Sequence, residues 1–154
     1  MRIGVISDTH GLLRPEALEA LRGSDLILHA GDVGEEEILG RLRTIAPVTT
    51  VRGNVDVARW ARGLPETEVI EVEGKAIYLL HKLDELDLNP KAAGFDAVVY
   101  GHSHRSKVEK KNGVLYFNPG SAGPRRFKLP VSVGRLVIEH GKIKAEVIEL
   151  QVSR

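Results

Sequence analysis

Residues 2–10, Arg-Ile-Gly-Val-Ile-Ser-Asp-Thr-His, place a continuous apolar run directly before two side chains that can bind metal. The run from Ile3 to Ser7 lacks polar alternation, which is typical of a parallel strand covered on both faces. Asp8 and His10 follow at its carboxyl end, where open α/β sheets bind their ligands. This stretch predicts an α/β fold with a polar site beside the first strand.

Four later segments repeat this arrangement of an apolar run followed by a metal-ligand side chain. The runs LILHA, VTTV, AIYLL and AVVY each end just before a polar loop. Because the carboxyl ends of such strands converge on one crevice, we expect all five loops to meet there. Their donors are Asp8, His10, Asp32, Asn54, His81, His102 and His104. Oxygen and nitrogen donors without cysteine predict a pair of divalent cations.

The composition limits the class of protein. Of 154 residues, 42% are hydrophobic and 28% are charged, which indicates one globular domain over residues 1–154. The net charge of +1 argues against nucleic acid as a partner. Cysteine is absent, so disulfides and thiolate zinc sites are excluded. Neither a leader peptide nor a membrane-length apolar run is evident, so we expect a cytoplasmic protein without membrane contact.

Apolar periodicity predicts alternating strands and helices in the first half of the chain. A helix beginning at Pro15 and another over about 35–45 separate strands near residues 3–7, 26–30 and 48–51. Strands joined through helices in this way should be parallel. His29 lies within the second of these strands, and we expect it to be a packed or hydrogen-bonded core residue rather than a ligand.

Hairpins dominate the predicted second half. Their turns are expected at Glu73-Gly74, Asn112-Gly113 and His140-Gly141. They join residues 68–72 to 75–80, 107–110 to 114–118, and 131–138 to 142–150. We also expect a strand at 97–100 and a short helix between 84 and 93, interrupted by Pro90. So many strands in one domain favour two packed sheets with helices on the outer faces.

The ordered set Asp-x-His, Gly-Asp, Gly-Asn, His and Gly-His-x-His resembles the calcineurin-like metallophosphoesterase superfamily. The SDTHG opening at residues 7–11 and the Asn-Pro-Gly-Ser segment at 118–121 resemble its small YfcE-type phosphodiesterase branch. That branch is related in fold to the retromer subunit vacuolar sorting protein 29. The resemblance covers nearly the whole chain and implies a four-layer α/β/β/α sandwich of two mixed β-sheets flanked by helices.

The resemblance also implies a ligand set by position. The first metal would bind Asp8, His10, Asp32 and His104. The second would bind Asp32, Asn54, His81 and His102, with Asp32 bridging. Asp32, Asn54 and His102 are the expected catalytic residues. A hydroxide held between two such cations attacks phosphorus at neutral pH. Imidazoles with carboxylates favour Mn²⁺, and Ni²⁺, Fe²⁺ or Zn²⁺ are compatible.

Two positions depart from the family pattern. Val55 stands where many relatives have a His that is thought to protonate the leaving group, although the YfcE branch also tends to lack it. Slow turnover or a preference for acidic leaving groups would follow. Lys82 follows His81 where relatives commonly have Gly, which should alter the neighbouring pocket wall.

The leading hypothesis is a metal-dependent phosphodiesterase or phosphatase that acts on small phosphate esters. One alternative is a non-catalytic metal-binding interaction scaffold resembling the retromer subunit, against which the intact ligand set argues. The other is a nuclease, which the near-neutral charge disfavours. The natural substrate, the diester or monoester preference, the native metal and the oligomeric state stay open, although a homo-oligomer is common for sandwich enzymes of this size.

Overall fold

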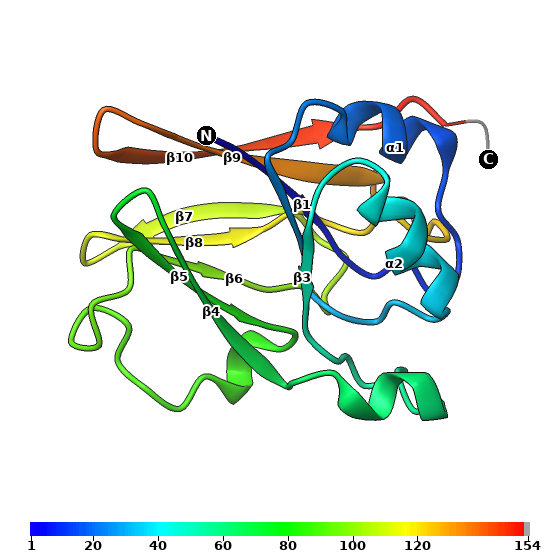
Figure 1. The fold of residues 1–154 in the computed structure, drawn as a ribbon, viewed down its shortest axis with the longest axis horizontal. Helices are drawn as coiled ribbons and strands as arrows, with labels where there is room; N and C mark the ends of the chain where they lie inside the picture. The colour runs from blue at the N-terminus through cyan, green and yellow to red at the C-terminus, as the bar shows by residue number, and fades with distance from the viewer. Residues whose placement is uncertain (153–154) are drawn as a thin grey trace.

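Two five-stranded sheets pack face to face in the computed structural model, which describes residues 1–152 (Figure 1). The first sheet has the order β10-β9-β1-β2-β3, with bounds β1 (Arg2–Ile6), β2 (Leu26–His29), β3 (Val48–Thr50), β9 (Ser132–Glu139) and β10 (Lys142–Glu149). The second has the order β4-β5-β6-β8-β7, with bounds β4 (Thr67–Val72), β5 (Lys75–Leu80), β6 (Ala97–Val99), β7 (Lys107–Lys111) and β8 (Val114–Asn118).

Both sheets are mixed. In the first, β1, β2 and β3 are parallel, as the alternation of strands and helices predicts, whereas β9 is antiparallel to both β1 and β10. In the second, β5, β6 and β8 are parallel, and β4 and β7 form antiparallel edges. The predicted sandwich of two mixed sheets is therefore confirmed.

The three predicted hairpin turns are present. Glu73, Asn112 and His140 have φ angles of 51°, 50° and 52°, and each is followed by a glycine that also has positive φ. Two consecutive residues with positive φ are the signature of the type I′ turn, whose twist matches that of the flanking strands. His140 is exposed in its turn.

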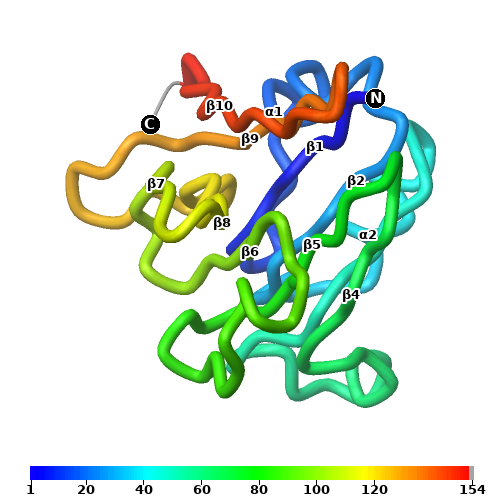
Figure 2. Tube along the Cα trace, turned by 90° about the vertical axis from the view of Figure 1, so that its left-hand side faces the viewer, coloured from blue at the N-terminus to red at the C-terminus, as the bar shows by residue number. Residues whose placement is uncertain are grey.

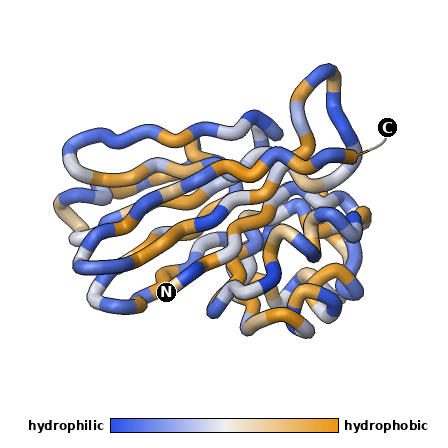
Figure 3. The backbone as a smooth tube through the Cα atoms, turned by 90° about the horizontal axis from the view of Figure 1, so that it is seen from above, coloured by the Kyte–Doolittle hydropathy of each residue, from blue (hydrophilic) through white to orange (hydrophobic). Residues whose placement is uncertain are grey.

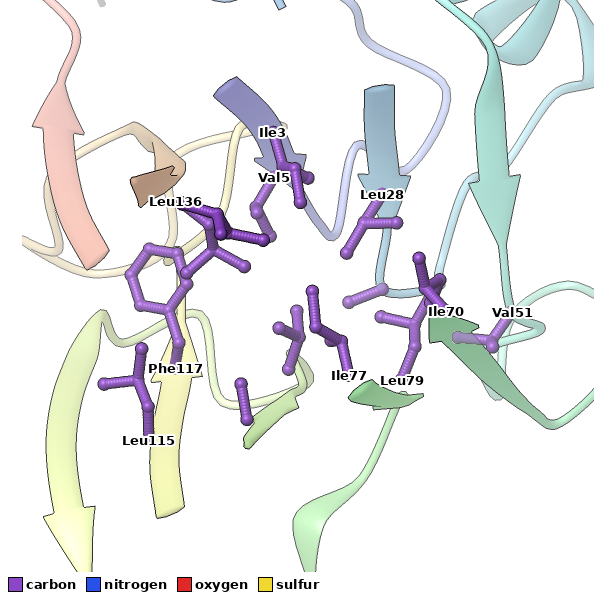
Figure 4. Packing of buried hydrophobic residues seen from close by; sticks show 14 residues of the cluster. Ile3, Val5, Leu28, Val51, Ile70, Ile77, Leu79, Leu115, Phe117 and Leu136 are labelled. Carbon is purple, nitrogen blue, oxygen red and sulfur yellow. The ribbon is translucent and has the colours of Figure 1, made fainter. Parts of the chain in front are cut away.

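The main core lies between the two sheets (Figure 4). Ile3, Val5 and Leu28 project into it from the first sheet, opposite Ile77 and Phe117 of the second. Ile3, Val5, Leu28, Ile77 and Phe117 are all 0% exposed, which explains the apolar character of these strands on the side that faces the core. The core fixes the strands, and with them the positions of the loops at their ends.

Two α-helices cover the outer face of the first sheet (Figure 2). α1 (Pro15–Leu21) buries Ala17 and Leu21, and α2 (Glu36–Arg43) buries Ile38, Leu39 and Leu42. Both are amphipathic, and Pro15 begins α1 as predicted, because its fixed φ suits the first helical position.

The outer face of the second sheet is covered by residues 83–95, and the helix predicted between 84 and 93 is wrong. Only the 3₁₀ turn η2 (Leu83–Glu85) forms there, followed by turns. Pro90 lacks an N–H, and Asn89 Oδ1 accepts a hydrogen bond from Ala92 N at 3.1 Å, which favours a turn over a helix. Leu83 and Phe95 nevertheless pack against the sheet.

Hydrophobic residues lie mainly within strands and helices, and the turns are largely hydrophilic (Figure 3). Among residues 1–152, no helix has both the length and the apolar composition that a bilayer span requires. The single domain over 1–154, the cytoplasmic location and the homo-oligomer stay predictions, and residues 153 and 154 lie outside the described part.

Candidate metal centre

The loops after β1 and β2 are joined by backbone hydrogen bonds. Asp8 N donates to Gly31 O at 3.0 Å, and His10 N donates to Asp32 O at 2.9 Å. The two strands are parallel neighbours, so their carboxyl ends lie at the same edge of the sheet. The predicted placement of Asp8, His10 and Asp32 side by side is therefore confirmed.

Two further contacts join these loops to the second sheet. His102 N donates to Asp8 Oδ2 at 3.1 Å, and His81 Nδ1 donates to Ala30 O at 2.7 Å. The first contact connects the loop after β6 to the loop after β1, and the second connects the end of β5 to the end of β2. The ligand loops of the two sheets thus meet at one edge of the sandwich.

Asp8, His10 and His104 form the first group of donors. His10 Nε2 lies 3.3 Å from His104 Nε2 and 3.7 Å from Asp8 Oδ1, and His104 Nε2 lies 3.5 Å from the same oxygen. Atoms at the corners of such a triangle lie about 2 Å from its centre, the usual length of a bond from zinc to nitrogen or oxygen. The group can therefore hold one transition-metal ion.

Asp32, His81 and His102 form the second group. Their ligand atoms lie within 4.8 Å of one another, and His81 Nε2 is 3.2 Å from Asp32 Oδ2. The rings of His81 and His102 meet edge to face, with centroids 5.2 Å apart. Asp32 and His81 are buried whereas His102 is exposed, so this group is open to solvent on one side.

Asp32 stands between the two groups. Its Oδ2 atom lies 3.7 Å from His10 Nε2 of the first group and 3.2 Å from His81 Nε2 of the second. Its Oδ1 atom accepts a hydrogen bond from Val55 N at 3.0 Å, which fixes the carboxylate plane. This is the arrangement expected of a carboxylate shared by two cations.

Asn54 is the least constrained of the predicted ligands. Its side chain is exposed, and none of the described hydrogen bonds joins its amide to either group. It does lie in the wall of the same cavity as His81, and the next residue, Val55, contacts Asp32. Its role as a ligand stays a prediction.

Three buried polar atoms at the centre lack a hydrogen-bond partner among the described residues. They are Asp8 Oδ1, His81 Nε2 and His104 Nδ1. Leaving a buried donor or acceptor unpaired costs roughly 1–3 kcal/mol, so such atoms are rare without a ligand. Asp8 Oδ1 and His81 Nε2 belong to the two donor groups, and coordination of cations would satisfy them. The residues present therefore fit a metal centre.

The backbone at the centre is strained. Asp8, His10, Asp32, His102 and His104 have φ angles of 56°, 46°, 57°, 73° and 63°. Positive φ is uncommon outside glycine, and residues held in this region cluster at functional sites. Within residues 1–152, five of the nine non-glycine residues with positive φ are predicted ligands, so the fold holds their side chains in place at an energetic cost.

The two carboxylates of the donor groups, Asp8 and Asp32, have lowered pKa values. Burial acts to raise the pKa of Asp32, but His81 and the N–H of Val55 outweigh it and bring the pKa to about 2. Burial likewise opposes ionisation of Asp8, yet His10 and other hydrogen-bonding neighbours lower its pKa. Both groups are therefore carboxylates at neutral pH, the form that binds cations.

The histidines differ in their affinity for protons. The neighbouring Asp8 carboxylate raises the pKa of His10. Burial acts to lower the pKa of His81, but Asp32 and Asp8 raise it overall. Burial lowers the pKa of His104. Because a cation competes with protons for an imidazole, metal binding to His10 and His81 should release protons.

Close packing of the loops requires glycine at two positions. A Cβ atom on Gly53 would overlap the backbone and carboxylate of Asp32, and one on Gly101 would overlap Ser7 Oγ. Each of these glycines directly precedes a predicted ligand, and the absence of a side chain there permits the close approach of the loops.

Sequence reasoning missed Asp56, which holds two of the ligand loops together. Its side chain is 3% exposed. Oδ2 accepts hydrogen bonds from Val33 N at 3.1 Å and Gly53 N at 2.9 Å, and Oδ1 accepts one from Gly34 N at 3.0 Å. The signal in the sequence was an acidic residue two positions after the Gly53-Asn54 pair.

His29 is a buried core residue, as predicted. Its Nδ1 atom accepts a hydrogen bond from Gly31 N at 3.1 Å, and its Nε2 atom lies 3.1 Å from Thr9 Oγ1. Since the Thr9 hydroxyl donates to Val33 O at 2.8 Å, Nε2 is the donor to Thr9. Complete burial lowers the pKa of His29 to about 4.

We expect His29 to make the protein less stable in mild acid. The unfolded chain protonates this imidazole below about pH 6.5 and the folded protein only near pH 4, so stability is lost as pH falls between these values. His29 should lower the free energy of unfolding by about 2 kcal/mol between pH 7.5 and pH 5. His29→Asn retains an acceptor for Gly31 N but cannot titrate. In urea unfolding with EDTA, the unfolding free energy should fall between pH 7.5 and pH 5 by about 2 kcal/mol less in the variant than in the wild type. Equal decreases in the two proteins would contradict the role of His29.

The protein-family model described as "Calcineurin-like phosphoesterase superfamily domain" matches residues 1–141 of the chain. A "Probable metallophosphoesterase" of Methanothermobacter thermautotrophicus is 36% identical, over 96% of this chain and 92% of its own length. The "Phosphodiesterase YfcE" of Escherichia coli is 27% identical, over 88% of this chain and 87% of its own.

Solved structures share the fold. Wild-type Vps29 of Entamoeba histolytica, in complex with Zn²⁺, matches with a TM-score of 0.75 and 26% identity, over 97% of this chain and 99% of its own. An archaeal phosphodiesterase matches with a TM-score of 0.79 over 96% of this chain and all of its own; at 24% identity, this match supports the fold alone.

Proposed function

Because the chain belongs to the calcineurin-like phosphoesterase superfamily, we propose that it is a phosphodiesterase that works with two divalent metal ions. Family membership supports a metal-dependent phosphoester hydrolase. The preference for diesters and the use of two ions are the proposal. The observation that supports two ions is the position of Asp32 Oδ2, 3.7 Å from His10 Nε2 and 3.2 Å from His81 Nε2.

The proposed ligand sets follow the two donor groups. Asp8, His10, Asp32 and His104 would hold the first ion. Asp32, Asn54, His81 and His102 would hold the second, with Asp32 shared. Imidazoles and carboxylates without thiolates suit Mn²⁺, Fe²⁺, Ni²⁺ and Zn²⁺ better than Mg²⁺ or Ca²⁺, and Mn²⁺ is the proposed native metal. The partner would be a small phosphate ester.

The residues of the chain would bind and orient the substrate. When bound, two divalent ions supply Lewis-acid stabilisation of the phosphoryl oxygens and an activated hydroxide nucleophile. Asp32 holds its carboxylate fixed between the groups through Val55 N, so the site needs little rearrangement before reaction. Exposed His102 and Asn54 lie on the open side, where Asn54 can donate an amide hydrogen bond to a phosphoryl oxygen.

Hydrolysis of bis-p-nitrophenyl phosphate in Mn²⁺ tests this function. The p-nitrophenolate leaving group departs without a proton, so the missing His at position 55 should not prevent turnover. The purified protein should release p-nitrophenolate, and metal analysis of the same sample should give two ions per chain. Full occupancy without turnover across a panel of diesters and monoesters would favour the interaction scaffold instead.

Introducing a proton donor at position 55 should speed hydrolysis of esters with poor leaving groups. Val55 is partly exposed, and its backbone N–H contacts Asp32, so a histidine there would lie beside the reacting group. Val55→His should raise kcat for a phenyl diester by about tenfold. The rate with a p-nitrophenyl diester should change less. Val108→His adds the same group to an exposed position on β7, outside the donor groups and the cavity beside His81, and should have no such effect. Equal gains for both diesters, or for both variants, would count against this role.

A further inference from the structure

A cavity of about 680 Å³ opens beside the second donor group. Gly53, Asn54 and His81 lie in its wall, so the cavity is continuous with the proposed metal centre. The other walls come from the segment after β3, which contains the 3₁₀ turn η1 (Arg59–Gly63), from β4 and β5, and from η2. These elements form the lower part of Figure 1. Cavities of roughly 300–1,000 Å³ are typical of small-molecule sites.

Charged side chains without partners line this cavity. Arg62 and Lys82 supply cationic donors, and Glu85 and Asp87 supply carboxylate acceptors. Within the described part of the chain, none of the four takes part in an ion pair. Such groups can exchange water for hydrogen bonds to a bound molecule.

The balance of charge in the cavity favours a polar group over an apolar one. Arg52 Nη2 and Glu66 Oε1 form an ion pair at 2.9 Å, so their charges offset each other. The two free cations are likewise matched by two free carboxylates. Arg62, Glu85 and Asp87 are exposed and Lys82 is half-buried, and a hydrocarbon group would displace water from them without offering hydrogen bonds, which is unfavourable. A group with several hydroxyls can donate to the carboxylates and accept from the cations.

Lys82 brings an ammonium group to this wall. It follows His81 directly, is half-buried and lines the cavity. A glycine there would leave the cavity wider and without an ammonium group. Lys82 does line the cavity, and the expectation that it alters the wall relative to related proteins stays a prediction.

We propose that this cavity binds one ester group of the phosphodiester, and that this group is polar, bears hydroxyls and is about the size of a sugar or a nucleoside. The proposal rests on the phosphodiesterase function proposed above, because it names the substrate class of the same site. Arg62 and Lys82 would act as specificity residues on one side, and Glu85 and Asp87 on the other.

Four p-nitrophenyl diesters test the proposal, because all release the same p-nitrophenolate. Their second ester groups are methyl, decyl, glucose through its 6-oxygen, and uridine through its 5′-oxygen. The sugar or nucleoside ester should exceed the methyl ester in kcat/KM by about tenfold, or about 1.4 kcal/mol, and the decyl ester should not. Whichever of the glucose and uridine esters has the higher kcat/KM shows whether the hydroxyl-bearing group is a sugar or a nucleoside.

Substitutions in the wall of the cavity test whether the preference for the polar ester arises there. Arg62→Ala combined with Lys82→Ala should reduce the ratio of the polar ester to the methyl ester by about tenfold. Thr67→Trp, which narrows the cavity without removing a charge, should also reduce it. Arg43→Ala combined with Lys142→Ala removes two exposed cations outside the cavity and should leave the ratio unchanged.

The outcomes separate the two proposals. Equal kcat/KM for all four diesters, fastest turnover of the decyl ester, or an unchanged ratio in both wall variants would overturn the inference while the phosphodiesterase function stands. Release of p-nitrophenolate from none of the diesters in Mn²⁺ would overturn both.

Discussion

Replacement of Asp32 by alanine is expected to reduce Mn²⁺-dependent hydrolysis of bis-p-nitrophenyl phosphate by at least about 10³-fold. The reason is the position of its Oδ2 atom, which faces His10 of one donor group and His81 of the other. Without a carboxylate there, the two cations would lose both a shared ligand and the negative charge that offsets their repulsion. Removing a ligand from one group only, as in His102→Ala, should also lower activity severely.

The metal content of the Asp32 variants shows whether they lose activity because they bind fewer ions or because the bound ions no longer support hydrolysis. Asp32→Ala should retain less than two Mn²⁺ per chain when the free Mn²⁺ concentration is limiting. Asp32→Asn keeps the shape of the side chain but lacks the negative charge, so it should resemble alanine rather than wild type. Asp84→Ala removes an exposed carboxylate outside the centre and serves as the matched control. An Asp32→Ala protein with wild-type turnover and two bound ions would contradict the bridging role.

Folded stability of the Asp32 variants should be measured on the same samples. The low pKa of Asp32, about 2, means that the folded protein stabilises its charged form through His81 and Val55 N, so replacing Asp32 can change the stability of the fold. Circular dichroism with EDTA establishes whether a loss of activity follows from unfolding. Activity lost with an unchanged thermal transition supports the proposed role.

The ligand loops could be predicted because strand order constrains them strongly. Asp8, Asp32 and His81 each follow an apolar run, and the carboxyl ends of parallel strands place such residues at a common edge. The hairpin turns could be predicted equally well, because the positive φ angles of Glu73-Gly74 and of the two corresponding pairs depend only on the residues of the turn itself. Both kinds of feature depend on short segments of sequence.

Features that depend on distant contacts could not be predicted. The error over residues 84–93 was different in kind, because Asn89 and Pro90 favour turns through local backbone chemistry, and those turns still cover the sheet. The cavity beyond His81 depends on where η1 and η2 lie in space, which no local pattern specifies. The partners of Asp56 at Val33 and Gly34 lie more than 20 positions away in the chain.

Replacement of Asp56 by alanine is expected to lower the free energy of unfolding by about 3 kcal/mol. The carboxylate is buried and accepts hydrogen bonds from Val33 N, Gly34 N and Gly53 N. Alanine would leave these three donors without their charged acceptor, and hydrogen bonds to charged groups each contribute more than neutral ones. For a chain of this size the thermal midpoint should fall by about 10 °C, measured calorimetrically with EDTA. Asp56→Asn should lose less, because one oxygen can still accept.

Asp56 should also affect metal affinity, because its hydrogen bonds position two ligand loops at once. Gly34 belongs to the loop of Asp32, and Gly53 directly precedes Asn54. If Asp56 positions ligands, Asp56→Ala below its melting temperature should need a higher Mn²⁺ concentration for half-maximal activity. Excess Mn²⁺ should then partly restore turnover, which it cannot do for Asp32→Ala. A purely structural role predicts lower stability with an unchanged Mn²⁺ requirement, and a loss of stability below about 1 kcal/mol would contradict the hydrogen-bond argument itself.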